Sequence, residues 1–418
     1  MVLYSRLIGV LVGLCLFVVL LTYRSFETQY IFYFSWLSGL TLTGLFICLT
    51  LYRCKLSRAA TVSLSFVVPW VILGIVFSNF AYDRPEHIKT LLITTFYMTS
   101  SVFIADMLVR SRINMEKYAY QMLILWVLVN LALLVLFFLG VYKPPKGDFS
   151  GVFHDRNVFS ITTLLVMTFA VTHLRKKPKQ LYTLGMYVGL IICIGMILIS
   201  KSITGLLGLL VLSVFYSFKL PINQRIIIFS TLVIALAGLL FTDNPISARI
   251  DRFLIAISGD TDSLRTSESA YLRIFLIQSG FELFSEHKWV GVGLNNAKEF
   301  VIWPNRGVGS FLHNNYLDIL TSGGLPLFVV YYTPIFYALT WLLMNKKKVR
   351  LLADKKSYDL WKLALVGLSL KLVYDLTWTT YFEFFMVFTV MLSIYIVFHL
   401  KTSIRRHKST LNYKVQQS

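Results

Sequence analysis

Basic residues gather in one long polar stretch of an otherwise apolar chain, between Thr242 and Leu317. The stretch contains Arg249, Arg252, Arg265, Arg273 and His313. Arginine forms charge-assisted hydrogen bonds to phosphate oxygens, and histidine has an unperturbed pKa of about 6.5, suited to proton transfer near neutral pH. The stretch therefore predicts a site that acts on an anionic partner.

A further basic residue, Lys201, ends a long apolar run in the sequence Ile-Ser-Lys-Ser-Ile-Thr. A lysine at the end of a membrane-spanning helix either extends its ammonium group to the interface or meets an anion. Lys201 would face the same outer layer as Arg273 and His313, so that these three basic groups could converge on a single anionic headgroup. We expect Lys201, Arg273 and Arg265 to bind a diphosphate; the alternative for Lys201 is a plain interfacial lysine.

These residues must be positioned by helices in a membrane. Apolar residues make up 56% of the chain and the mean hydropathy is +0.69, whereas soluble proteins average about 45–50% apolar residues. We predict an all-α, polytopic integral membrane protein with about twelve transmembrane helices. The predicted spans are 7–23, 30–52, 60–82, 90–109, 118–141, 157–174, 181–200, 203–218, 226–241, 324–344, 358–378 and 382–400.

The positions of Lys and Arg predict the orientation. Their clusters between the spans fall on one side if the helices alternate, and positively charged short loops stay cytoplasmic. Both termini are then cytoplasmic, and 242–317, between helices 9 and 10, forms one large loop on the outer face. We treat 1–418 as a single transmembrane domain with 242–317 as a subdomain. The net charge of +20 then largely reflects topology and not nucleic-acid binding.

Within the outer loop, 268–286 places apolar residues at helical spacing among polar ones, which predicts an interfacial helix. The glycines Gly291 and Gly293 predict a plain turn after it. In the spans, Lys371 and Asp375 are one turn apart and predict a structural ion pair, whereas Asp106 is expected to be solvated near the cytoplasmic end of its span. No set of His, Cys and carboxylate residues has the spacing of a zinc site.

Several short motifs follow one another along the predicted outer face. They are Gly151 to Asn157 before a span, Ser200-Lys201-Ser202, Arg273, Gly291 to Asn295, His313 to Leu317, and Gly323-Gly324. Their order resembles the O-antigen ligase and O-antigen polymerase superfamily, by motif over about 151–327 and by topology over the whole chain. The resemblance implies a multi-pass glycosyltransferase of the bacterial inner membrane, with its active face in the periplasm and neither metal nor cofactor.

The resemblance also implies the reaction, in which a glycan leaves undecaprenyl diphosphate and joins a sugar hydroxyl. Arg273 and Lys201 would stabilise the departing diphosphate, and His313 would take the proton of the acceptor hydroxyl. The family usually has arginine where this chain has Lys201, which keeps the charge and loses the bidentate fork. A structural role for His313, tying the loop to the next span, is the alternative. Sugar or acceptor contacts are expected from Asp155, Asn157, Asn314, Asn315 and Tyr316.

Polymerase and ligase share this donor and chemistry, and differ in the acceptor, which is the growing repeat unit or lipid A-core. The run HNNYLDILTSGGLPLFVVYY favours the polymerase, for which membrane lipids and a chain-length regulator would be further partners. A twelve-span secondary transporter is the competing class. Such transporters commonly show two related halves, whereas here the polar mass lies late in the chain and outside the spans.

Overall fold

A computed structural model describes the chain over 56–110, 115–144, 148–151, 153, 155–173, 180–217, 221–223, 226, 230, 268–302, 309–352 and 354–417. These residues are mostly α-helical, and none of them forms a strand beyond one isolated bridge between Ile302 and Gly309. The all-α prediction is confirmed for this part of the chain. The predicted spans 7–23 and 30–52, most of 226–241, and the residues His154 and Arg265 lie outside the described residues.

The described residues form thirteen helices. They are α3 (Arg58–Ser65), α4 (Val67–Phe77), α5 (Arg84–Arg110), α6 (Met115–Phe138), α7 (Arg156–His173), α8 (Gln180–Ile199), α9 (Ile203–Ser217), α13 (Glu268–Glu286), α14 (Ala297–Phe300), α15 (Asn315–Met344), α16 (Lys346–Leu352), α17 (Lys355–Asp375) and α18 (Phe384–Gln417).

Five stretches of these described helices are long and apolar enough to cross a membrane. They are Arg58–Phe77, Arg84–Arg110, Ala119–Phe138, Asn315–Met344 and Phe384–Arg406. The helices predicted at 157–174, 181–200 and 203–218 form as shorter apolar helices, and α17 occupies the span predicted at 358–378. The protein is thus a multi-pass membrane protein, and the total of twelve spans stays a prediction.

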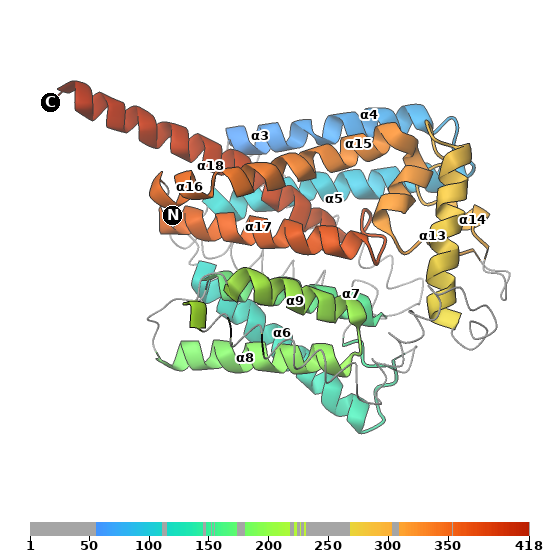
Figure 1. The fold of residues 1–418 in the computed structure, drawn as a ribbon, viewed down its shortest axis with the longest axis horizontal. Helices are drawn as coiled ribbons and strands as arrows, with labels where there is room; N and C mark the ends of the chain where they lie inside the picture. Colours follow the sequence, from blue (N-terminus) through green and yellow to red (C-terminus); the bar gives the residue numbers. More distant parts are fainter. Residues whose placement is uncertain are drawn as a thin grey trace.

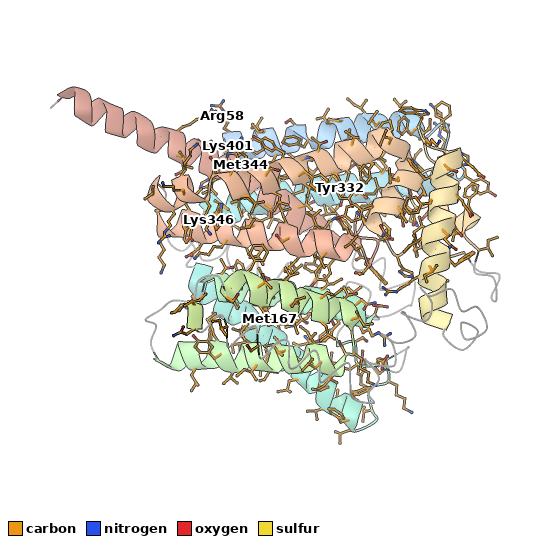
Figure 2. All side chains as sticks on the ribbon, viewed as in Figure 1. Arg58, Met167, Tyr332, Met344, Lys346 and Lys401 are labelled. Atoms are coloured by element: carbon orange, nitrogen blue, oxygen red, sulfur yellow. The ribbon has the colours of Figure 1, made fainter. Side chains whose placement is uncertain are left out.

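The long helices pack into two groups, the upper and lower groups of Figure 1. The first helix group, α3, α4, α5, α15, α17 and α18, buries a core that includes Trp70, Tyr332 and Tyr395. The second helix group, α6 to α9, buries a core around Trp126 and Phe159. Figure 2 labels Tyr332 in the first group and Met167 in the second. Helix α17 packs against α7 and α9 and so joins the two groups.

Helix α13 runs across the ends of the long helices, roughly perpendicular to them, whereas the lysine-rich α16 lies at the opposite end of the molecule (Figure 1). The bounds of α13, Glu268–Glu286, are those predicted from the apolar spacing. One face buries Leu272, Leu276 and Leu283. This orientation fits a helix at the membrane interface.

Helix α15 begins earlier than the predicted span 324–344. It starts at Asn315, because the Asn314 side chain caps it by accepting a hydrogen bond from the Leu317 N–H. The extra turns carry Asp318 and Ser322, which precede the predicted span and are buried. Thr379, from beyond α17, donates to the Asp318 carboxylate at 2.8 Å, and this partner is what allows a polar helix start to lie inside the protein.

The expectation for Asp106 was wrong, because its side chain is buried and not solvated. Its Oδ1 accepts a hydrogen bond of 2.8 Å from the Tyr395 hydroxyl of α18. Its Oδ2 lies 3.2 Å from Arg110 Nη1, one turn along α5. Asp106 therefore joins two helices whose partner residues are far apart in the sequence.

Candidate functional site

Helix α13 and the segment before α15 share one small apolar core. Leu272 and Leu276 of α13 pack in it with Leu312 and Leu317, on either side of His313. A Cβ atom at Gly280 would lie 3.2 Å from Leu312, so α13 passes close to this segment. The helix that carries Arg273 and the segment that carries His313 are therefore fixed to each other.

The turn after α13, Gly291 to Asn296, is a close joint between two backbones. The N–H groups of Val292 and Gly293 donate to the carbonyls of Thr321 and Ser322, both at 2.8 Å. A Cβ atom at Gly291 would lie 2.4 Å from the Ser322 carbonyl carbon. Gly291 has φ +71 as well, so both the close approach and the backbone angle require glycine.

The other half of this joint is the break in α15. Gly324 has φ +63 inside the helix, and the next N–H, that of Leu325, donates to the Lys288 carbonyl at 2.8 Å. A Cβ atom at Gly324 would lie 2.5 Å from the Trp289 carbonyl carbon. Gly291 and Gly324 thus form a close contact between two backbone segments, whereas the sequence predicted only a plain turn at Gly291 and Gly293.

The same turn is held by residues at the start of α5. His87 is buried; its Nδ1 accepts a hydrogen bond of 2.8 Å from the Leu294 N–H, and its Nε2 lies 2.8 Å from the Gly74 carbonyl oxygen. Because Nδ1 accepts, Nε2 carries the proton and donates to Gly74. Glu86 accepts a hydrogen bond of 2.5 Å from the Asn295 side chain. Sequence reasoning missed His87, whose partners lie on other segments.

His313 lies half-buried directly before α15, in the left-handed backbone region with φ +50. Its ring centroid is 4.9 Å from that of Trp378, with 40° between the ring planes. Few non-glycine residues adopt this backbone region, and they cluster at functional sites. The sequence named His313 but gave no sign of its contact with Trp378.

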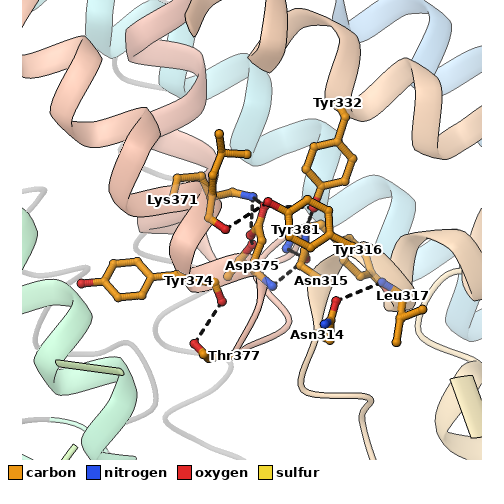
Figure 3. Close-up of polar contacts among 12 residues, drawn as sticks. Asn314, Asn315, Tyr316, Leu317, Tyr332, Lys371, Tyr374, Asp375, Thr377 and Tyr381 are labelled. Atoms are coloured by element: carbon orange, nitrogen blue, oxygen red, sulfur yellow. Dashed lines mark hydrogen bonds and ion pairs between the residues drawn. The ribbon is translucent and has the colours of Figure 1, made fainter. Parts of the chain in front are cut away.

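Asn315 fastens the connection between α17 and α18 to the start of α15 (Figure 3). Its Oδ1 accepts hydrogen bonds from the N–H groups of Thr380, at 2.7 Å, and Tyr381, at 2.8 Å. Its Nδ2 donates to the Tyr332 hydroxyl at 2.9 Å. The side-chain oxygen of Asn315 thus accepts two hydrogen bonds from within the protein. Asn315 therefore acts as a brace beside His313.

Tyr316 and Tyr381 extend this brace. The Tyr316 hydroxyl donates to the Leu372 carbonyl at 3.0 Å, and its ring stacks on Tyr332 at 4.9 Å between centroids. The Tyr381 hydroxyl accepts from the Asn295 N–H at 2.9 Å. Burial raises the pKa of Tyr381 well above its ordinary value, which keeps this hydroxyl neutral. The brace thus links the Gly291 to Asn296 turn, α15 and the connection before α18.

A buried ion pair supports the brace from α17 (Figure 3). Lys371 and Asp375 have no exposed side-chain surface, and Lys371 Nζ lies 2.5 Å from Asp375 Oδ1. Asp375 also accepts hydrogen bonds from the hydroxyls of Tyr332 and Thr380. The structural pair predicted from the one-turn spacing is confirmed. Its additional donors offset part of the cost of burying two charges.

Lys201 lies on the second helix group, between α8 and α9, also in the left-handed backbone region with φ +52. Its Nζ is 3.4 Å from Asp148 Oδ1, and Arg156 pairs with the same carboxylate. The side chain is 42% exposed. Lys201 is therefore partly exposed and paired with a protein carboxylate.

The structure brings the Lys201 segment together with the start of α7. The Ser202 hydroxyl donates to Asn157 Oδ1 at 2.8 Å, and the hydroxyls of Ser200 and Ser160 lie 3.0 Å apart. Asp155 Oδ1 accepts from the Asn157 N–H at 2.7 Å, which caps α7. Asp155 and Asn157, expected to contact a sugar, have these structural partners.

Helix α17 and Trp378 connect the two parts of the structure that carry the predicted site residues. Trp378 packs against the core of the second helix group, and its ring also contacts His313. The second helix group contains α8 and α9, which flank Lys201. Tyr374 of α17 lies close to Gly208 of α9, because a Cβ atom at Gly208 would be 2.4 Å from the Tyr374 hydroxyl oxygen. Arg273 and His313 are therefore held by one set of contacts, Lys201 by another, and α17 contacts both.

Residues 188–332 match the family model of the O-antigen ligases. The match supports the resemblance to the O-antigen ligase and polymerase superfamily over this segment. The matched segment includes Lys201, Arg273, His313 and Asn315, whereas Trp378 lies beyond it. No curated protein matches the chain. The match supports an enzyme that works on glycan and lipid-linked substrates, in agreement with the resemblance seen in the motifs.

Proposed function

We propose that the protein is a glycosyltransferase of the bacterial inner membrane that moves a glycan from undecaprenyl diphosphate to a sugar hydroxyl on the periplasmic face. The observation that carries the proposal is the family match over 188–332, which contains His313 and the basic residues Lys201, Arg265 and Arg273. Its most specific form is a polymerase that extends O-antigen or another surface polysaccharide.

In the proposed reaction the acceptor hydroxyl oxygen attacks the anomeric carbon of the donor sugar. The bond from that carbon to the diphosphate oxygen breaks, and undecaprenyl diphosphate leaves with the electron pair. His313 accepts the proton of the hydroxyl, while Arg273, Lys201 and Arg265 stabilise the charge on the departing diphosphate. The attack on the opposite face would invert the anomeric carbon, and the step uses no metal ion.

An apolar cavity of about 120 Å³, enough for a short section of a polyprenyl chain, supports a lipid-linked donor. It lies where the two helix groups meet, with a lining that includes Leu108 of α5, Phe169 of α7 and Phe388 of α18. Hydroxyl groups also line it, and each donates to a carbonyl one turn earlier in its own helix. They belong to Thr162, Thr168, Thr389 and Ser393.

Because those hydroxyls are satisfied within their helices, the cavity wall behaves as hydrocarbon. Apolar cavities of this size stay dry and accept apolar guests. A polyprenyl chain entering between the two helix groups would match the wall chemically, while its diphosphate stays at the end of the molecule that carries α13. This division suits a donor with one very apolar and one strongly anionic part.

A ligase that joins the finished polymer to lipid A-core is the second candidate, and the description of the matching family model favours it. Deletion of the gene in its host separates the two. Surface polysaccharide is resolved by size on a gel, and undecaprenyl-linked glycan is measured in parallel. Single repeat units on lipid A-core identify a polymerase, whereas long polymer on undecaprenyl diphosphate with bare core identifies a ligase. An unchanged glycan profile would contradict both.

A further inference from the structure

Trp378 contacts the His313 ring from a connection that is fixed on both sides. Before it, the N–H groups of Thr377 and Trp378 donate to the Tyr374 carbonyl, both at 2.9 Å, which ties them to the end of α17. After it, the Thr379 hydroxyl donates to Asp318 Oδ2 at 2.8 Å. The backbone of Trp378 is therefore attached to α17 on one side and to α15 on the other.

The next residue reinforces this attachment. The Thr380 N–H donates to Asn315 Oδ1 at 2.7 Å, and Asn315 is two residues after His313. The Thr380 hydroxyl donates to Asp375, whose charge is balanced by the buried Lys371. The backbone beside His313 and the backbone beside Trp378 are thus bound to each other through Asn315.

The indole ring is held by packing as well. It is half-buried and lies against the core of the second helix group. One ring therefore contacts both His313, directly before α15, and the apolar residues of the second helix group. His313 has the sparsely populated φ of +50, and such an angle persists only where surrounding contacts determine it.

We propose that Trp378 is the positioning residue for His313, holding the imidazole ring in the orientation in which it accepts the proton of the acceptor hydroxyl. The proposal rests on the role of His313 in the proposed function. Catalytic groups act at full rate only when their geometry is fixed, and a misplacement of about 1 Å can reduce the rate about 10²-fold. Trp378 touches the histidine and not the reacting atoms, so its loss should affect turnover and not donor binding.

The test measures kcat and KM for transfer from an undecaprenyl-diphosphate-linked glycan, with the full chain in lipid vesicles. We expect Trp378→Phe, which keeps an aromatic ring, to retain kcat within about threefold. Trp378→Leu and Trp378→Ala should lower kcat by about 10- to 100-fold while the donor KM stays within about twofold. Trp378→Leu keeps an apolar side chain against the second helix group, so it separates loss of the ring from loss of packing.

Phe215→Ala is the matched control, because Phe215 is a half-buried aromatic residue that packs against the cores of both helix groups. It should leave kcat unchanged. The proposal is overturned if Trp378→Leu retains full kcat, or if it raises the donor KM alone. An active His313→Ala would instead overturn the role of His313 in the proposed function, whereas an inactive His313→Ala beside a fully active Trp378→Leu would overturn only the positioning role.

Discussion

Lys371 and Asp375 form an ion pair one turn apart on α17, and neither side chain is exposed. Removing one partner leaves a buried charge without its counter-charge, which typically costs about 3–5 kcal/mol. We expect Asp375→Leu to lower the stability of the detergent-solubilised protein by about this amount, measured as the loss of helical signal on heating.

The double variant Lys371→Met with Asp375→Leu is the control for this pair. It removes both charges, so it should recover part of the lost stability. A double variant as unstable as the single one would mean that the hydrogen bonds from Tyr332 and Thr380 to Asp375, and not the charge balance, dominate.

His313→Ala should abolish glycan transfer while the protein still accumulates in the membrane. The proposed proton acceptor is lost, and general-base catalysis contributes about 10²- to 10⁴-fold. Polymer length on a gel reports transfer, and immunoblotting of membranes reports insertion. Normal polymer in this variant would remove the histidine from the mechanism.

Arg273→Ala should give the same phenotype for a different reason. Arg273 is half-buried on α13, beside the apolar face that packs against the His313 segment. Loss of its charge should weaken stabilisation of the leaving diphosphate, at a cost of about 10²-fold or more in rate. Leu276→Ala, which loosens α13 but keeps the charge, is the comparison; an equal defect in both would point to folding and not to charge.

Lys201 allows a sharper test because its carboxylate partner is known. Lys201→Arg should retain most transfer and Lys201→Ala should lose about tenfold or more, since arginine keeps the charge and can bind phosphate. Asp148→Asn removes the pairing partner at 3.4 Å and leaves the cation. A defect in Asp148→Asn equal to that of Lys201→Ala would show that the ion pair, and not diphosphate binding, is the function of Lys201.

The close backbone contact at Gly291 predicts that a residue with a side chain is not tolerated there. A methyl group there would lie 2.4 Å from the Ser322 carbonyl carbon, at φ +71. We expect Gly291→Ala to destabilise the protein by about 1–3 kcal/mol. Gly195→Ala is the matched control, because a methyl group at Gly195, inside α8, meets nothing within 4 Å. Equal melting curves for the two variants would contradict the close approach.

Local patterns predicted much of the fold. The apolar spacing of 268–286 gave the bounds of α13, and the one-turn spacing of Lys371 and Asp375 gave their pairing. Both depend on residues close together in the chain. The roles of His313 and Arg273, which the family motifs suggested, stay predictions.

What the sequence missed depends on contacts between distant residues. Asp106 looked solvated because its partner Tyr395 is 289 positions away. His87 was overlooked because its bond to Leu294 spans 207 positions. Trp378 was read as the end of a span, where tryptophan is common, and nothing near it in the sequence indicates His313. The start of α15 was placed late because Asp318 and Ser322 are polar, and the distant Thr379 that bonds to Asp318 gives no local signal.

The backbone joint between Gly291 and Gly324 also limits how this enzyme can be recombined with its relatives. An exchanged segment that ended between α14 and α15 would pair one parent's glycine turn with the other parent's helix break, and any side chain at either position would collide. An exchanged piece therefore has to include everything from Lys288 to Leu325, because the Leu325 N–H donates to the Lys288 carbonyl and closes the joint. Acceptor preference in hybrid proteins is best mapped with that whole piece as the unit.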